Sequence, residues 1–325
     1  MKRHILCAAL FVCGTGSSCV TNEPKSEPIQ VSHELKPDSK SLARWTKSLR
    51  DQQPEDAFAA VYRVRGRYLI FVAAVHENRT ESATFRMVRD AYDGFNIDTV
   101  IAEGYPTSKG MNPQGLMVYA SEQAREGFQE GGETVPTVAG AVREGAGVWG
   151  GEPDNANILA RVVAEGFSVA DVLGYYVLRV IPQWERERKI LNAADPQLRA
   201  LVDAQIRRAR GELQIDAAVL PDYESWAAWY EGLNGKSIAA GLAVEEVGPL
   251  HDGSYGTNRI AAAISRARDS YLHELMIGHL NAGETVLVVF GGSHLMIQRP
   301  ALDRALGPPC YVGQILSDAP RRCRS

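Results

Sequence analysis

The stretch "RYLIFVAAVHENRTESATFRMVRDAYDGFNIDTVIAEGY" (Arg67–Tyr105) decides the fold. Residues Tyr68 to Val75 are almost wholly apolar, which is typical of a strand buried on both faces. A helix is expected from Thr80 to Phe95, because Thr80 is a capping residue and the apolar side chains after it recur at helical spacing. The segment "IDTVIAEGY" predicts the next strand. A strand, a helix and a strand in this order predict a parallel, right-handed βαβ unit.

The rest of the chain extends this pattern. A short strand is expected at Gly147–Gly150, and the apolar run of "VLVVFGGSHL" (Val286–Leu295) predicts another. Between them, about residues 168–250, charged and aromatic helical segments predict a helical insert. The sequence therefore predicts a single α/β domain over residues 41–325, with a central, mostly parallel sheet flanked by helices.

The bulk composition is that of a globular protein. The chain has 325 residues and is 45% hydrophobic, which is enough for a substantial core. Its formal net charge is -4 and its isoelectric point is about 6.0, and no basic stripe is visible. We therefore expect no nucleic-acid partner.

The first 19 residues have the pattern of an export signal. Lys2 and Arg3 form a positive start, and "ILCAALFVC" (Ile5–Cys13) is an apolar run too short to span a bilayer. Small residues before Cys19 resemble a bacterial lipobox, although Gly16 stands where a lipobox normally has leucine. We expect lipidation at Cys19 and an outer-membrane or periplasmic lipoprotein of the bacterial cell envelope. Ordinary cleavage near Ser18 is the alternative.

A flexible linker is expected over residues 20–40, which are polar and rich in proline. It would connect the membrane anchor to the domain. In the body of the chain only Cys310 and Cys323 remain. In an oxidising compartment these two cysteines are expected to form a disulfide that holds the C-terminal segment.

Four predicted strands end in a group that can bind a metal or move a proton: His76, Glu103, Glu152 and His294. The carboxyl ends of parallel strands share one edge of a sheet, so these four side chains are expected to converge. They would form a ligand set for a divalent metal, with His76, Glu103 and His294 as ligands, or an acid/base set that acts directly on a substrate. The alternative for each residue alone is an ordinary boundary or capping role.

At these residues the chain resembles a known superfamily. The motifs "VAAVHEN", "VIAEGYP", "RARDSYL" and "VVFGGSHL" occur in the same order in the erythromycin-esterase-like, ChaN-like and TraB/GumN/Tiki proteins. The resemblance implies an α/β fold with these histidines and Glu103 at its site, and it matches Arg268 and Asp269 to a shared arginine–acid pair. The chain departs from it at Ala73, where a G-x-x-H motif has glycine, and it lacks an acid shortly before His76.

The resemblance and the strand ends together predict a metal-dependent hydrolase that acts on an ester, lactone or amide of a small molecule or peptide. Its catalytic residues would be the four strand-end groups, and Arg79, Tyr105 and Arg268 would bind substrate. The alternative is a ligand-binding lipoprotein for haem or iron without turnover, in which the aromatic segment Tyr223–Tyr230 would line an apolar pocket. The pattern does not fix the oligomeric state.

Overall fold

The computed structural model describes residues 34–106, 127, 129 and 131–324, with only the backbone of Tyr105 and Pro106. Residues Leu35–Ser325 form one compact unit. The predicted signal, its Cys19 and nearly all of the predicted linker lie outside the described residues. No helix within the described ranges is both long and apolar enough to cross a membrane.

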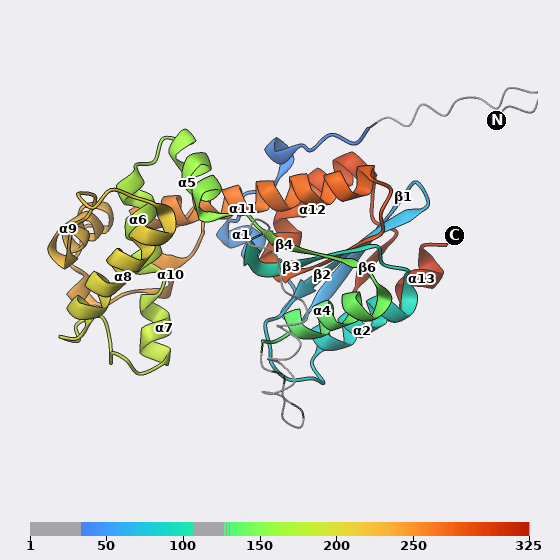
Figure 1. Cartoon of the computed structure of the whole chain (residues 1–325), viewed down its shortest axis with the longest axis horizontal. Helices are drawn as coiled ribbons and strands as arrows, with labels where there is room; N and C mark the ends of the chain where they lie inside the picture. Colours follow the sequence, from blue (N-terminus) through green and yellow to red (C-terminus); the bar gives the residue numbers. More distant parts are fainter. Residues whose placement is uncertain (1–33, 107–126, 128, 130, 325) are drawn as a thin grey trace, which may run out of the picture. The chain divides into compact units, whose positions relative to one another are not determined.

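The described residues form a six-stranded sheet in the order β4-β3-β5-β2-β1-β6. Neighbours among β4, β3, β5 and β2 are parallel, whereas β1 is antiparallel to both β2 and β6 (Figure 1). The predicted α/β fold with a mostly parallel sheet is confirmed. The strands are β1 (Phe58–Val64), β2 (Arg67–Ala74), β3 (Thr99–Pro106), β4 (Gly147–Glu152), β5 (Val286–Gly291) and β6 (Tyr311–Gly313).

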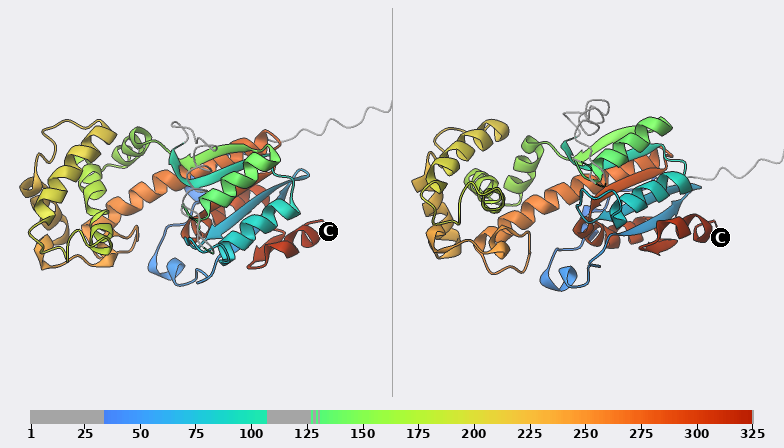
Figure 2. Two further views of the ribbon diagram at one scale, coloured as in Figure 1. Left: turned by 60° about the horizontal axis from the view of Figure 1, so that its bottom comes forward. Right: turned by 90° about the horizontal axis from the view of Figure 1, so that it is seen from below.

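Helices cover both faces of the sheet, which explains why β5 is buried at every residue. On one face, Met87 and Val88 of α2 (Ala83–Gly94) pack against strand residues, together with α4 (Thr134–Glu144) and α13 (Ala319–Arg322). On the other face lie α11 (Gly256–Asn281) and α12 (Gly292–Leu306). Figure 2 shows the sheet between these two layers.

The helix α2 begins later than the sequence predicts. Ser82 is its N-cap, and the Ser82 hydroxyl accepts a hydrogen bond from the Phe85 N–H. Thr80 instead uses its backbone N–H to reach the carbonyl of Gly127. Both are good capping residues, so composition alone does not distinguish them.

The helical segment between β4 and β5 has its own core, to which the first half of α11 contributes. Trp226 and Tyr230 are fully buried there, and the Trp226 Nε1–H donates to the carbonyl of Gly174 at 3.1 Å. The aromatic segment therefore packs helices together and leaves no apolar pocket at these two side chains. The helices are α5 (Asn155–Ala164), α6 (Val169–Leu178), α7 (Ile181–Arg186), α8 (Leu198–Leu213), α9 (Tyr223–Asn234) and α10 (Val244–Val247).

Short elements lie at the two ends of the described chain. Cys310, just before β6, and Cys323, just after α13, form a disulfide with a sequence separation of 13 residues. This bond joins the edge of the sheet to the C-terminal segment. The remaining short elements at the ends are η1 (Ser39–Ser41), α1 (Lys47–Arg50) and η4 (Leu316–Asp318), whereas η3 (Ile238–Ala240) lies within the helical segment.

Candidate active site

The carboxyl ends of the parallel strands meet as expected from their order. Ala74 at the end of β2 pairs with Gly291 at the end of β5, and Ala102 of β3 pairs with β5 and β4. The structure thereby brings four predicted residues into one group: His76, Glu103, Glu152 and His294.

Glu103 lies at the centre of this group. Its Oε2 accepts a hydrogen bond from the Gly291 N–H at 2.6 Å, and its Oε1 accepts one from Arg268 Nη2 at 3.2 Å. The two histidines approach the same carboxylate from either side. His76 Nε2 lies 3.6 Å from Oε2, and His294 Nε2 lies 3.5 Å from Oε1. The Glu103 carboxylate therefore lies next to two imidazoles and a guanidinium.

A second carboxylate fixes the far side of each imidazole. His76 Nδ1 lies 2.6 Å from Glu133 Oε1, and His294 Nδ1 lies 2.7 Å from Asp269 Oδ1. Asp269 is itself held, because its Oδ2 accepts a hydrogen bond from Ser265 Oγ at 3.2 Å. A carboxylate at Nδ1 fixes the orientation of a histidine ring and leaves Nε2 for chemistry. In both histidines that Nε2 faces Glu103.

Arg268 joins the two predicted glutamates. Its Nε and Nη2 donate to the two oxygens of Glu152 at 2.6 and 2.5 Å, and its Nη2 also reaches Glu103. A bidentate pair of this kind is among the strongest in proteins when water is largely excluded. The Glu152 side chain is only 11% exposed, so Arg268 neutralises charge that water cannot reach well.

Charge pairing shifts the pKa values of the two buried groups, His294 and Glu103. Burial works against the charged form of His294, but Asp269 and Glu103 outweigh it and raise the pKa of His294 to about 10. Burial likewise opposes ionisation of Glu103. The contacts with His294 and Arg268 and the Gly291 N–H prevail and hold the pKa of Glu103 well below its usual range. At neutral pH the pair is an imidazolium and a carboxylate.

His76 differs from His294 in its access to solvent. The His76 side chain is 61% exposed, compared with 7% for His294. The hydrogen bond to Glu133 is the largest cause that raises the pKa of His76 above its ordinary 6.5, and burial opposes it. Of the two imidazoles, His76 is therefore the one that a substrate or water molecule reaches directly.

Gly291 allows this close approach. A Cβ at this position would lie 3.0 Å from His76 Nε2 and 3.4 Å from Glu103 Oε2. We expect Gly291→Ala to displace the imidazole, which would lower the kcat/KM of a reaction that uses His76 by about 10- to 100-fold, since small misplacements of reacting groups are costly. The matched control is Gly211→Ala in α8, where an added Cβ meets nothing within 4 Å. Equal activity of the two variants would contradict the role given to Gly291.

Two of the predicted substrate-binding residues are not seen in this group. Arg79 is 76% exposed, and its Nε donates to Glu77 Oε2 at 2.8 Å, so its guanidinium is held by a neighbour in sequence. Tyr105 belongs to β3, but its side chain lies outside the described residues. Arg268 is the predicted arginine that contacts both glutamates.

Sequence reasoning did not assign Glu133 or Asp269 to the site. Asp269 could be suspected only from its place after Arg268 in the arginine–acid pair. No sequence pattern marks Glu133 as a site residue, because it lies in "GGETVP" at the start of α4 and follows no strand. Both are 8% exposed or less, a rare environment for a carboxylate without a partner.

The predicted metal site is not assembled in this arrangement. Two imidazole nitrogens and a carboxylate are suitable donor types for zinc. However, the part of the chain that the structure describes has no group of three or more His, Cys, Asp and Glu that could hold a metal ion. The guanidinium of Arg268 also occupies the Oε1 side of Glu103 with positive charge. The metal therefore stays a prediction that the arrangement of these side chains does not support.

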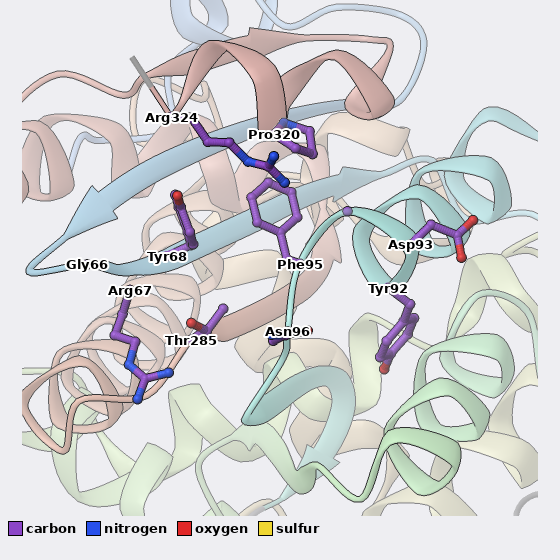
Figure 3. A pocket seen from close by; sticks show the side chains of 11 residues that line it. Gly66, Arg67, Tyr68, Tyr92, Asp93, Phe95, Asn96, Thr285, Pro320 and Arg324 are labelled. Carbon is purple, nitrogen blue, oxygen red and sulfur yellow. The ribbon is translucent and has the colours of Figure 1, made fainter.

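A pocket of about 270 Å³ opens beside this group and has Glu152 and Arg268 in its wall. Another cavity, of about 390 Å³, lies at the opposite ends of the strands, next to the starts of β2 and β5. Figure 3 shows its lining, which includes Arg67, Phe95 and Arg324. None of the predicted site residues lines it, and ligands of open parallel sheets bind at the carboxyl ends. Of these two pockets, the first is the one that lies at the site.

Comparisons with protein-family models, with curated proteins and with solved structures find no match to this chain. The resemblance to the erythromycin-esterase-like, ChaN-like and TraB/GumN/Tiki proteins stays a prediction. The geometry of the group around Glu103 is the feature that indicates a function.

Proposed function

We propose that this site hydrolyses an ester, lactone or amide bond, with His76 as general base. The observation that carries the proposal is the shared carboxylate. Two imidazoles, each fixed at Nδ1 by its own carboxylate, direct Nε2 toward Glu103, and only His76 is open to solvent. An exposed, oriented histidine beside a buried charged network is a typical acid/base arrangement.

The roles follow from the charges. Neutral His76 donates its Nδ1–H to Glu133, which leaves the lone pair of Nε2 free to accept a proton. A water molecule bound between His76 Nε2 and Glu103 Oε2 would attack the carbonyl carbon and give its proton to His76. The developing oxyanion would face the guanidinium of Arg268, which the pocket exposes. His76 would then protonate the leaving oxygen or nitrogen, releasing an acid and an alcohol or amine.

His294 acts through Glu103 in this scheme. Its side chain is nearly inaccessible, and its imidazolium form pairs with Glu103 Oε1. Together with Arg268 it keeps Glu103 ionised, so that Glu103 Oε2 can accept a hydrogen bond from the attacking water. His294 is thus a positioning residue.

The pH dependence tests this assignment. We expect kcat/KM to rise as His76 loses its proton, above its ordinary pKa of 6.5. It should fall as His294 loses its proton at a pKa of about 10, because the imidazolium that holds Glu103 in place is then lost. Glu133→Gln removes the largest cause that raises the His76 pKa, so it should move the acid limb to lower pH. The measurement uses p-nitrophenyl valerate, δ-valerolactone and valeryl p-nitroanilide, with buffer rates subtracted.

Two outcomes contradict the proposal. One is the absence of hydrolysis of all three compounds, and the other is an acid limb that does not move in Glu133→Gln. Dialysis against a chelator tests the predicted metal in the same assay. Activity that is lost on dialysis and restored by Zn²⁺ would make His76 a ligand and not the base.

A further inference from the structure

The pocket beside the site has a wall that the catalytic scheme does not use. Glu152 and Arg268 border it on the side of the site. Most of the rest of its wall comes from the helical segment, with Asn155 at the start of α5 and with Tyr176 and Arg179 at the end of α6. At about 270 Å³ it is smaller than most pockets for whole ligands, so it fits one substituent of a substrate.

The charges in this wall do not cancel. Arg268 forms a bidentate pair with Glu152 and also contacts Glu103, so it contributes no excess positive charge. Arg179 has no such counterpart, because within the described ranges its guanidinium forms no ion pair and stacks on the Tyr176 ring, 4.2 Å from the centroid. Such stacking holds a guanidinium in place while its N–H groups stay available. One positive charge is left over for a ligand.

Hydrogen-bond donors lie on the same wall. The Tyr176 hydroxyl donates to Asn155 Oδ1 at 3.2 Å, which leaves the Asn155 amide N–H groups to face another acceptor. Asn155 is also the first residue of α5, where Asp154 caps the Asn157 N–H and the Asn155 N–H has no partner in the part of the chain that is described. Donors together with one excess cation are complementary to an anion.

We infer that this pocket binds a carboxylate carried by the substrate, which makes the substrate an acidic ester, lactone or amide. The inference rests on the proposed function for the bond that is cut, and Arg179 is then a specificity residue. A single uncompensated charge matches a carboxylate better than a phosphate dianion. The carboxylate would lie on Arg179 and Asn155, on the far side of Arg268 from His76.

A pair of esters of equal length tests the inference. We expect wild-type protein to hydrolyse the p-nitrophenyl monoester of glutaric acid with a higher kcat/KM than p-nitrophenyl valerate. Arg179→Gln should lower the glutarate value by about 10- to 100-fold, as expected for loss of a charged hydrogen bond, and change the valerate value less than about threefold. Arg207→Gln, an exposed position of α8 outside the pocket, is the control and should change neither.

Glutarate binding gives a readout that needs no turnover. Calorimetry with His76→Asn protein should show glutarate binding that Arg179→Gln weakens by a similar factor. If neither ester is cleaved but glutarate binds through Arg179, the proposed function fails and the pocket assignment stands. The inference is overturned if valerate is cleaved as fast as the acidic ester, or if Arg179→Gln leaves glutarate binding unchanged.

Discussion

His76→Asn is expected to lower kcat/KM for p-nitrophenyl valerate by about 10² to 10⁴-fold, the usual contribution of a general base. Asparagine keeps a polar group near Glu133 but has no nitrogen that accepts a proton at the position of Nε2. Because the His76 side chain is 61% exposed, its replacement removes little packing. The midpoint of urea unfolding should therefore stay close to that of the wild type, so that the loss reports chemistry.

The matched control is His279→Asn. His279 also has its Nδ1 against a carboxylate, Glu284, at 2.7 Å, but it lies at the other end of α11, away from the strand-end group. We expect that variant to keep its activity to within about threefold, as for a residue that contacts no reacting group. A comparable loss in both variants, or none in His76→Asn, would remove His76 from the role of base.

Arg268→Met is expected to have the largest effect on stability. It leaves Glu103 and Glu152, which are 18% and 11% exposed, without their shared cation. Breaking a buried ion pair by removing one partner typically costs about 3–5 kcal/mol, because the remaining charge is poorly solvated. The urea midpoint should fall accordingly, and ester hydrolysis should fall with it, since the proposed mechanism places Arg268 against the developing oxyanion.

Two further variants test whether the burial of the unpaired carboxylates causes this loss of stability. Arg268→Met combined with Glu152→Gln should recover part of the loss, because one unpaired carboxylate is then absent. Arg161→Met breaks a bidentate pair with Glu274 whose side chains are 31% and 40% exposed, and it should cost about 1 kcal/mol or less. Equal costs for Arg161→Met and Arg268→Met would show that burial of the carboxylates does not govern stability here.

The site was predictable where it follows from strand order. The apolar runs that end at His76 and before His294 signal strands buried on both faces, and parallel pairing then forces their ends together. Glu103 and Glu152 follow from the same rule. The position of β5 between β3 and β2 is not visible in the sequence, yet it is what lets Glu103 reach both histidines.

What could not be predicted depends on contacts between distant elements. Glu133 reaches His76 from the start of a helix, where a glutamate is usually solvated. The sequence predicts that Arg79 binds substrate, and in the structure its guanidinium pairs with Glu77, two residues away. A local ion pair of this kind depends on backbone direction, which residue spacing does not determine. The burial of Trp226 and Tyr230 depends equally on helices that pack from elsewhere in the chain.

The helix α11 makes the position of the group around Glu103 depend on packing elsewhere in the domain. It is one continuous helix of 26 residues. Its first half belongs to the core of the helical segment, and its second half packs on the sheet. Arg268 and Asp269 lie between these two anchorages. A substitution that leaves a cavity under the first half of α11, for example at Ile264, would let the helix shift. Arg268 and Asp269 would then move away from Glu103 and His294. Core substitutions far from the substrate should then lower the proposed turnover even where the protein stays folded.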